Sequence, residues 1–257
     1  MKITILVNRD LPALLALNYL LPSLDKHQVS VFYTNKAPVK DLPTALQQLA
    51  KFERQLLLEI DNSDSDKKLL SLEQLGRYTC AGIVQLNAVN SIDFAKLQQS
   101  QPDLIVSIRH MTILHAAAIN LPRLGAVNLH SGLLPSYQGV MSTFRAMGNK
   151  EAMVGSSLHF IEDQKIDSGA IIAQAQLAMH PNKSYFWNVL NLYRQGCQLI
   201  QNAVDCLASE ETLASIPQDG LAYYYSYPKQ QDLTEFAEKG FKLFEIDDLS
   251  DFERSLS

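Results

Sequence analysis

The chain has 257 residues, 47% of them hydrophobic and 19% charged, and its formal net charge is −5 at pH 7. This composition excludes an intrinsically disordered chain, because disorder requires low hydrophobicity together with high net charge. The negative balance also argues against an extended nucleic-acid surface, which needs net basic charge, and the length suffices for one large domain or two smaller ones.

The first half of the chain alternates between strand and helix patterns. Short apolar runs rich in β-branched residues predict buried parallel strands, and longer stretches with apolar residues on one face predict helices. Strands are predicted at residues 3–7, 29–33, 104–107 and 125–129, and helices at 11–21, 42–58 and 111–119, with a short helix opening at Ser91. This order predicts a Rossmann-like α/β fold, a mostly parallel sheet with helices on both faces.

The pattern changes after Gly139. A helix is predicted at 143–148, two strands at 157–161 and 170–177 joined by a polar connector, and one long helix at 184–207 that Ser184 caps. Farther along lie an aromatic run at 223–227, a short helix near Phe236 and a strand at 241–246. We therefore divide the chain into a principal domain, residues 1–207, and a small α+β tail subdomain, residues 208–257, docked on it.

The absence of several common sequence motifs excludes some classes of enzyme. The glycines fit neither a dinucleotide-binding turn nor a phosphate-binding P-loop, and the patterns of serine hydrolases and zinc proteases are absent. Three cysteines without Cys-x-x-Cys spacing argue against a disulfide framework or a cysteine-rich zinc site, so we expect no metal and a reducing compartment. The apolar runs are too short for a secretory signal or a membrane span, which favours a cytoplasmic protein.

Asn128 and His130 are the sharpest candidates for chemistry. They are two positions apart at the carboxyl end of a predicted strand, so both side chains point to the same side, where α/β proteins place ligands. Both can donate hydrogen bonds to a developing oxyanion, and His130 can transfer a proton near neutral pH. Asp167, in the following polar connector, is the candidate acid group that orients His130. The alternative is that Asn-x-His occurs by chance and Asp-Ser-Gly is only a turn.

Five motifs in the middle of the chain give these residues a family context. They are Pro-Asp-Leu-Ile-Val-Ser at 102–107, Gly-Ala-Val-Asn-Leu-His at 125–130, Leu-Leu-Pro-x-Tyr-x-Gly at 133–139, Gly-x-Ser-Leu-His-Phe-Ile at 155–161 and Ile-Asp-Ser-Gly-Ala-Ile-Ile at 166–172. In order and spacing this stretch resembles the 10-formyltetrahydrofolate-dependent formyltransferases. The resemblance implies a formyl transfer to an amine, with the family's catalytic Asn, His and Asp at Asn128, His130 and Asp167.

The resemblance also implies where the co-substrate binds. The folate of the family lies between the loop before the Asn strand and the loop before the Asp, here residues 108–112 and 161–166. The residues expected to contact 10-formyltetrahydrofolate are Ile108, Arg109, His110, Met111, Ile161, Asp163 and Ile166. Backbone groups are expected to hold the pterin ring more than side chains do.

The sequence says less about which amine accepts the formyl group. The size of the chain and its aromatic tail favour a small-molecule amine on an amino-sugar nucleotide over methionyl-tRNA, glycinamide ribonucleotide or hydroxyornithine, with a catalytically inactive folate-binding module as a further alternative. We expect no membrane or nucleic-acid partner, and a homodimer is left open. The tyrosines at 223–225 and 227 serve either as a platform for a base or as packing for the tail. Arg9 and Asp10 either bind the acceptor or start a helix, and His159 is expected to be structural.

Overall fold

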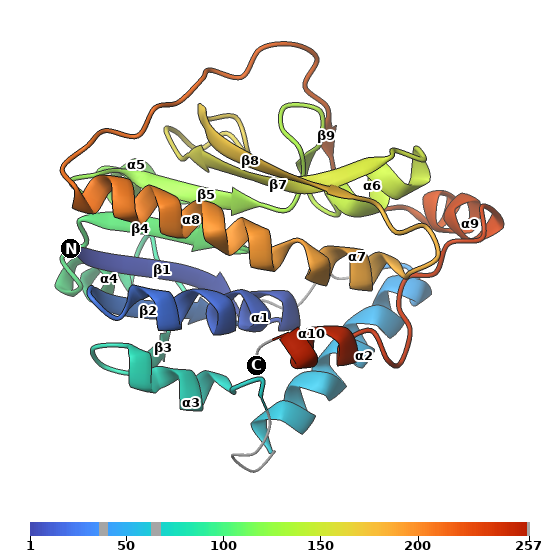
Figure 1. Cartoon of the computed structure of the whole chain (residues 1–257), viewed down its shortest axis with the longest axis horizontal. Coiled ribbons are helices and arrows are strands. Elements are labelled where there is room, and N and C mark those ends of the chain that lie inside the picture. The colour runs from blue at the N-terminus through green and yellow to red at the C-terminus, as the bar shows by residue number, and fades with distance from the viewer. Residues whose placement is uncertain (36–40, 63–67, 256–257) are drawn as a thin grey trace.

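A seven-stranded sheet in the order β3-β2-β1-β4-β5-β7-β8 runs through the centre of the computed structural model, which describes residues 1–35, 41–62 and 68–255 (Figure 1). The first five strands of this order are parallel, and β7 and β8 are antiparallel to their neighbours. The strands are β1 (Lys2–Asn8), β2 (Gln28–Thr34), β3 (Ile83–Gln85), β4 (Leu104–Ile108), β5 (Ala126–His130), β7 (Met153–Phe160) and β8 (Ile171–Ala178). The predicted Rossmann-like fold class is confirmed.

Helices cover both faces of the sheet, as the buried parallel strands require. Ile3, Ile5 and Val7 of β1 face a large core cluster that includes α1, α7 and α8, whereas Leu6 faces a smaller cluster with Leu97 of α4 and residues of α5. The helices are α1 (Leu11–Leu20), α2 (Thr44–Asp61), α3 (Leu72–Leu75), α4 (Phe94–Gln99), α5 (Ala116–Ile119), α6 (Ser142–Gly148), α7 (Tyr185–Asn191), α8 (Tyr193–Ala208), α9 (Gln230–Glu238) and α10 (Ser250–Ser255), with short 3₁₀ turns at Leu21–Leu24 and Gly76–Tyr78. Side chains therefore alternate between two apolar layers along β1.

The predicted helix at 111–119 is wrong over its first half, since only Ala116–Ile119 is helical. Asn90 explains the difference, because its side-chain amide donates to the carbonyl of Ile113 at 2.8 Å and accepts from the backbone N–H of His115 at 2.8 Å. These main-chain groups pair with a side chain from another loop instead of with helical partners four residues away. The extended segment that results borders the cavity described below.

The predicted helix at 184–207 is two helices. Leu192 separates α7 from α8 and donates its N–H to the carbonyl of Val189 at 3.2 Å, a tighter 3₁₀-type bond that breaks the α-helical series. Ser184 caps α7 as predicted, since its hydroxyl accepts from the N–H of Trp187 at 2.9 Å.

The predicted strand at 241–246 is wrong as well. The carbonyls of Lys242 and Leu243 instead accept the N–H groups of Tyr185 and Phe186, at 2.8 and 2.9 Å. These N–H groups belong to the first turn of α7 and have no partner within the helix. The segment therefore completes a helix end rather than a sheet.

Core packing and a short strand pair both join the tail to the body. Leu233 and Phe236 of α9, Leu249, and Phe252 of α10 belong to the same core cluster as the sheet. Tyr224–Tyr225 forms β9, which pairs in parallel with β6 (Gln138–Gly139) in a separate two-stranded sheet. The predicted boundary at residue 207 stays a prediction, and residues 36–40, 63–67 and 256–257 of the two predicted units lie outside the described residues. Within the described residues, no helix has both the length and the apolar character of a membrane span.

The capping of α7 gives a stability prediction. The Ser184 hydroxyl also donates to the carboxylate of Asp248 at 2.6 Å, and both residues are buried. Ser184→Ala removes the helix cap and leaves a buried carboxylate short of one donor, so we expect a loss of about 1–3 kcal/mol in the free energy of unfolding. Urea titration measures this loss. The exposed Ser215→Ala is the control, and equal stability of the two variants would contradict the capping role.

Candidate active site

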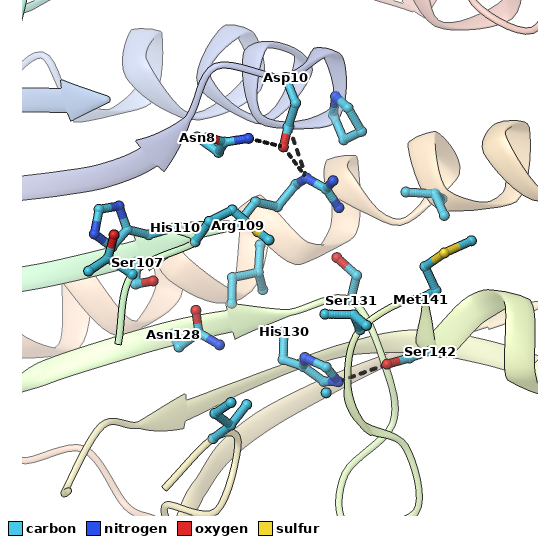
Figure 2. A pocket seen from close by; sticks show the side chains of 18 of the residues that line it. Asn8, Asp10, Ser107, Arg109, His110, Asn128, His130, Ser131, Met141 and Ser142 are labelled. Carbon is cyan, nitrogen blue, oxygen red and sulfur yellow. Dashed lines mark hydrogen bonds and ion pairs between the residues drawn. The ribbon is translucent and has the colours of Figure 1, made fainter. Parts of the chain in front are cut away.

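A cavity of about 790 Å³ opens at the carboxyl ends of the parallel strands. Figure 2 shows its two walls, with Asp10 and Arg109 on one side and Asn128 and His130 on the other. A doubly wound sheet places ligands at this edge, and the volume is typical of a small-molecule site.

Asn128 and His130 both line the cavity from the end of β5. The neighbouring Val127 and Leu129 point into the core, so the strand alternation that the sequence predicts holds here. His130 is buried and Asn128 half-buried. The strand thus provides two polar side chains on a rigid support, aimed at the same space.

Asp167 joins them from the connector between β7 and β8. Its backbone adopts the left-handed conformation, with φ of 54°, and this places the carboxylate against β5. One carboxylate oxygen, Oδ2, accepts the N–H of Gly139 at 2.9 Å and lies 3.3 Å from Nδ1 of His130. The other, Oδ1, accepts from the side-chain amide of Asn128 at 3.3 Å. The three residues predicted from the sequence therefore meet at one point.

The charge of Asp167 is maintained by its neighbours. Burial by itself raises the pKa of this carboxyl, but His130, His159 and the Gly139 N–H outweigh it and hold the pKa below its usual value. A buried carboxylate in this position stays ionised at neutral pH. It can therefore act as a base toward His130 without first losing a proton.

The hydrogen bonds of His130 define its protonation. Nε2 lies 2.6 Å from the backbone carbonyl of Tyr137, and a carbonyl oxygen only accepts, so Nε2 carries a hydrogen. Ser142 Oγ lies 3.2 Å from the same nitrogen and donates to the same carbonyl at 3.0 Å (Figure 2). The nitrogen left to exchange a proton is Nδ1, which faces Asp167.

His159 is a member of the site that the sequence reasoning missed. It is buried, and its Nε2 lies 3.1 Å from Nδ2 of Asn128 and 3.4 Å from Oδ1 of Asp167. Its Nδ1 donates to the carbonyl of Phe160 at 2.8 Å, which leaves Nε2 to accept. The signal lies in the strand register, because β7 runs antiparallel to β5 with His159 directly opposite Asn128.

The side-chain amide of Asn128 retains a donor for a ligand. Its two acceptors, His159 Nε2 and Asp167 Oδ1, are only 3.4 Å apart. Acceptors placed along the two separate N–H bonds of one amide would be about 5 Å apart, because those bonds diverge by about 120°. One N–H therefore serves both acceptors, and the second remains available in the direction of the cavity.

The residues expected to hold a folate fall into two groups. Six of the seven line the cavity: Arg109, His110 and Met111 after β4, and Ile161, Asp163 and Ile166 after β7. Ile108 does not, since its side chain is completely buried in the core as the last residue of β4. Backbone direction explains this difference, because the chain leaves the sheet only at Arg109, which has a positive φ of 57°.

The wall opposite Asn128 carries a compact charge cluster. The carboxylate of Asp10 caps α1 by accepting from the N–H of Ala13 at 2.9 Å and pairs with Nε of Arg109 at 2.9 and 3.0 Å. Asp10 therefore has the helix-start role that the sequence left as one alternative. Arg9 reaches Asp61 of α2 at 2.7 Å.

Glu53 on α2 belongs to the same cluster, and the sequence analysis did not single it out. Its carboxylate accepts from the N–H of Leu11 at 2.8 Å and lines the cavity. Burial, reinforced by the charge of Asp10 and opposed by that of Arg109, raises the pKa of Glu53 to about 7. Because protein carboxylates already accept from Leu11 and Ala13, the start of α1 offers fewer free donors for an anionic ligand.

In the part of the chain that the structure describes, no group of three or more His, Cys, Asp or Glu side chains is arranged to hold a metal ion. The side chains that converge on the cavity instead suit hydrogen bonding and proton transfer at a carbonyl group. Asn128 provides a donor, and the His130–Asp167 pair provides a buried proton acceptor.

Known proteins with the same features are formyl transferases. Residues 84–186 match the model of the formyl transferase family, and this segment contains Asn128, His130, His159 and Asp167. A methionyl-tRNA formyltransferase from Synechococcus sp. (strain JA-3-3Ab) is 32% identical over 139 residues, which are 54% of this chain and 42% of that protein. Residues 84–186 are thus similar to the formyl transferase family, and the match spans less than half the length of that relative.

Solved structures share the fold over most of the chain. A glycinamide ribonucleotide transformylase from Symbiobacterium toebii has a TM-score of 0.59 and 16% identity, covering 84% of this chain and 93% of that one. An N-formyltransferase from Helicobacter canadensis, in complex with folinic acid and dTDP-3-aminofucose, has a TM-score of 0.53 and 20% identity, covering 90% and 72%. At these identities the likeness shows the fold alone.

The raised pKa of Glu53 predicts a pH dependence of stability. The folded chain keeps this proton to a higher pH than the unfolded chain, so the free energy of unfolding falls as pH rises from 4.5 to about 7. Glu53→Gln keeps the acceptor for Leu11 and removes the titration. We expect the variant to be more stable than the wild type by roughly 1–3 kcal/mol at pH 8 and by less at pH 5.

Urea titrations from pH 5 to pH 8 measure this difference. Glu59→Gln, an exposed glutamate on the same helix, is the matched control and should leave the pH dependence of the wild type unchanged. If Glu53→Gln has the same pH dependence as the wild type, the charge cluster does not disfavour the ionised form of Glu53.

Proposed function

We propose that the protein transfers the formyl group of 10-formyltetrahydrofolate to a primary amine. The observation that carries this proposal is the convergence of Asn128, His130 and Asp167 on one wall of the cavity, where Asn128 and His130 each lie 3.3 Å from a carboxylate oxygen of Asp167. The match of residues 84–186 to the formyl transferase family model supports the same reaction class.

The chemistry requires no covalent intermediate on the protein. The amine nitrogen attacks the formyl carbon, the carbonyl electron pair moves onto oxygen, and the bond from the formyl carbon to N10 of the folate then breaks. The free N–H of Asn128 stabilises the negative oxygen, whereas both ring nitrogens of His130 face protein groups, Tyr137 and Asp167. The proton lost by the amine passes to the His130–Asp167 pair and returns to N10, so charge and protons balance.

The character of the cavity rim supports a folate-sized donor. Met111, Ile113 and Ile166 line the cavity, yet each is more than a third exposed. Partly exposed apolar side chains around a polar site are typical of surfaces that cover a flat ring system. Arg109 and His110 on one side and Ile161 and Asp163 on the other are the further contacts that we propose.

We propose an amino-sugar nucleotide as the acceptor. The described tail brings Tyr224 and Tyr227 to the cavity, and Tyr224 is 57% exposed, as a stacking platform for a base requires. The Helicobacter canadensis N-formyltransferase was solved in complex with dTDP-3-aminofucose, an amino-sugar nucleotide. Methionyl-tRNA, glycinamide ribonucleotide and hydroxyornithine are the competing acceptors.

An assay of tetrahydrofolate release with a panel of amines tests the reaction and its residues together. Asn128→Ala and His130→Ala should each lower kcat on the order of 10²–10³-fold, because the first removes the oxyanion donor and the second removes a member of the pair that takes up the proton. Asp167→Asn should be equally severe, since one amide cannot both accept from Gly139 and serve as the base for His130.

The exposed His115→Ala and Asp25→Asn are the matched controls, and both should keep wild-type turnover. Near-wild-type turnover in Asn128→Ala or His130→Ala on the best acceptor would refute the catalytic assignment. Folate binding without release of tetrahydrofolate from any amine would support the inactive binding module instead.

The tyrosines separate acceptor binding from packing. Tyr225 stacks on Tyr137 at 5.8 Å between ring centroids and lies under the guanidinium of Arg145 at 5.4 Å, so Tyr225→Ala should lower the melting temperature. Tyr224→Ala should instead raise the KM for the sugar nucleotide by about 5-fold or more, because a stacked base contributes about 1–3 kcal/mol.

Tyr224→Phe is the control for the second effect, since it keeps the ring and should keep the KM for the acceptor. The KM for the folate donor should stay unchanged in all three variants. If Tyr224→Ala alters no acceptor KM, the tail has no part in binding the acceptor and the preference for a sugar nucleotide loses its structural support.

A further inference from the structure

The left-handed turn at Asp167 needs support from outside the connector. A positive φ of 54° is unfavourable for a residue with a side chain, and such a conformation persists only where surrounding contacts impose it. The flanking residues 162–166 are all exposed, so the connector itself provides little packing. Contacts that hold the turn come from β6 and from the tail.

Gln218 in the tail makes the most direct of these contacts. Its side-chain amide donates one hydrogen bond to the carbonyl of Asp167 at 2.7 Å and another to the carbonyl of Gly169 at 2.8 Å. Both N–H bonds of one amide thus hold the two carbonyls on either side of Ser168. The amide oxygen of Gln218 accepts from Gln138 at 3.1 Å, and Gln138 also donates to the carbonyl of Asp167, at 3.2 Å.

The tail also fixes the donor that binds the Asp167 carboxylate. The N–H groups of Gln138 and Val140 donate to the carbonyls of Tyr223 and Tyr225, both at 2.9 Å. Successive N–H groups of an extended strand point in opposite directions, so the N–H of Gly139 points away from the tail. It donates to Oδ2 of Asp167 at 2.9 Å.

A third contact ties the same segment to the sheet. Ile216 exchanges two backbone hydrogen bonds with Ile171, the first residue of β8, each at 2.8 Å. We call residues 216–225 the tail clamp. It bonds to the chain on both sides of Asp167: to β6 through β9, and to the connector and the start of β8 through Gln218 and Ile216.

We propose that Gln218 is a positioning residue for formyl transfer, which holds the backbone turn of Asp167 so that its carboxylate meets both His130 and the Gly139 N–H. This inference rests on the proposed function. Gln218 touches neither the formyl group nor the amine. It acts through the Asp167 main chain, and loss of its two donors lets the turn relax toward a backbone conformation that an aspartate prefers.

A pair of substitutions tests the role of the amide donors. Gln218→Ala removes the side chain, whereas Gln218→Glu keeps its size and the oxygen that faces Gln138 but turns an oxygen toward the two carbonyls. Both variants should lower kcat by about 10-fold to 100-fold, since misplaced supporting groups cost this much, and leave the KM for the folate donor within about 3-fold. The matched control is Gln231→Ala on α9, whose side chain bonds to Glu235 at the surface.

The pH profile of kcat provides a readout that loss of packing alone would not move. A less well-held Asp167 loses part of the Gly139 and His130 contacts that favour its ionised form. The acidic limb of the profile should therefore shift to higher pH in both Gln218 variants and stay in place in Gln231→Ala. Full kcat with an unshifted profile in Gln218→Glu would overturn the proposal.

The amide proton of Gly139 separates this proposal from the proposed function. Its NMR chemical shift reports the hydrogen bond to Asp167 without any turnover, and it should move upfield in Gln218→Ala and Gln218→Glu. A wild-type protein that transfers no formyl group would refute the function and leave this shift to decide the structural role. An unchanged Gly139 shift in both variants would refute the positioning role even in an active enzyme.

Discussion

The site depends on keeping one buried carboxylate, that of Asp167, in its charged form. Asp167 is 8% exposed, and burial alone would favour its neutral form. It stays ionised because two histidines and one backbone N–H surround it, and each of these groups is placed by a different element: His130 by β5, His159 by β7 and Gly139 by β6. The antiparallel addition of β7 to a parallel sheet is therefore part of the site's construction. It brings His159 opposite Asn128, so that one residue contacts both the amide and the acid.

The two walls of the cavity differ in what they can do. The wall formed by β5 and the connector groups hydrogen-bond donors around one acid, which suits a reaction at a carbonyl group. The wall formed by α1, α2 and the residue after β4 groups Asp10, Glu53 and Arg109, whose charges largely compensate one another. A ligand between them meets a reactive surface on one side and a nearly balanced, strongly hydrogen-bonded surface on the other.

The sequence predicts the sheet and the three meeting residues because their signals are local. Buried strands such as β1 are continuous apolar runs, and the Asn128–His130 spacing fixes the side of β5 on which both lie. Prediction from the sequence fails where groups far away in the chain determine the local structure. Asn90 bonds to the main chain at residues 113–115, which are therefore not helical. The first N–H groups of α7 bond to the carbonyls of Lys242 and Leu243, which are therefore not in a strand. His159, Glu53 and Gln218 escaped prediction for the same reason, since each acquires its role from partners more than thirty residues away.

The parallel pairing of β6 with β9 couples the position of the Asp167 carboxylate to the docking of the tail. This coupling is reciprocal, so a change at either place affects the other. Any molecule that binds more tightly when Asp167 is correctly placed must also favour the docked tail over the undocked one, by the same free energy. Occupancy of the cavity should then be visible far from it, as slower hydrogen exchange and slower proteolysis between residues 216 and 225. The tail would then respond to occupancy of the cavity as well as support the site.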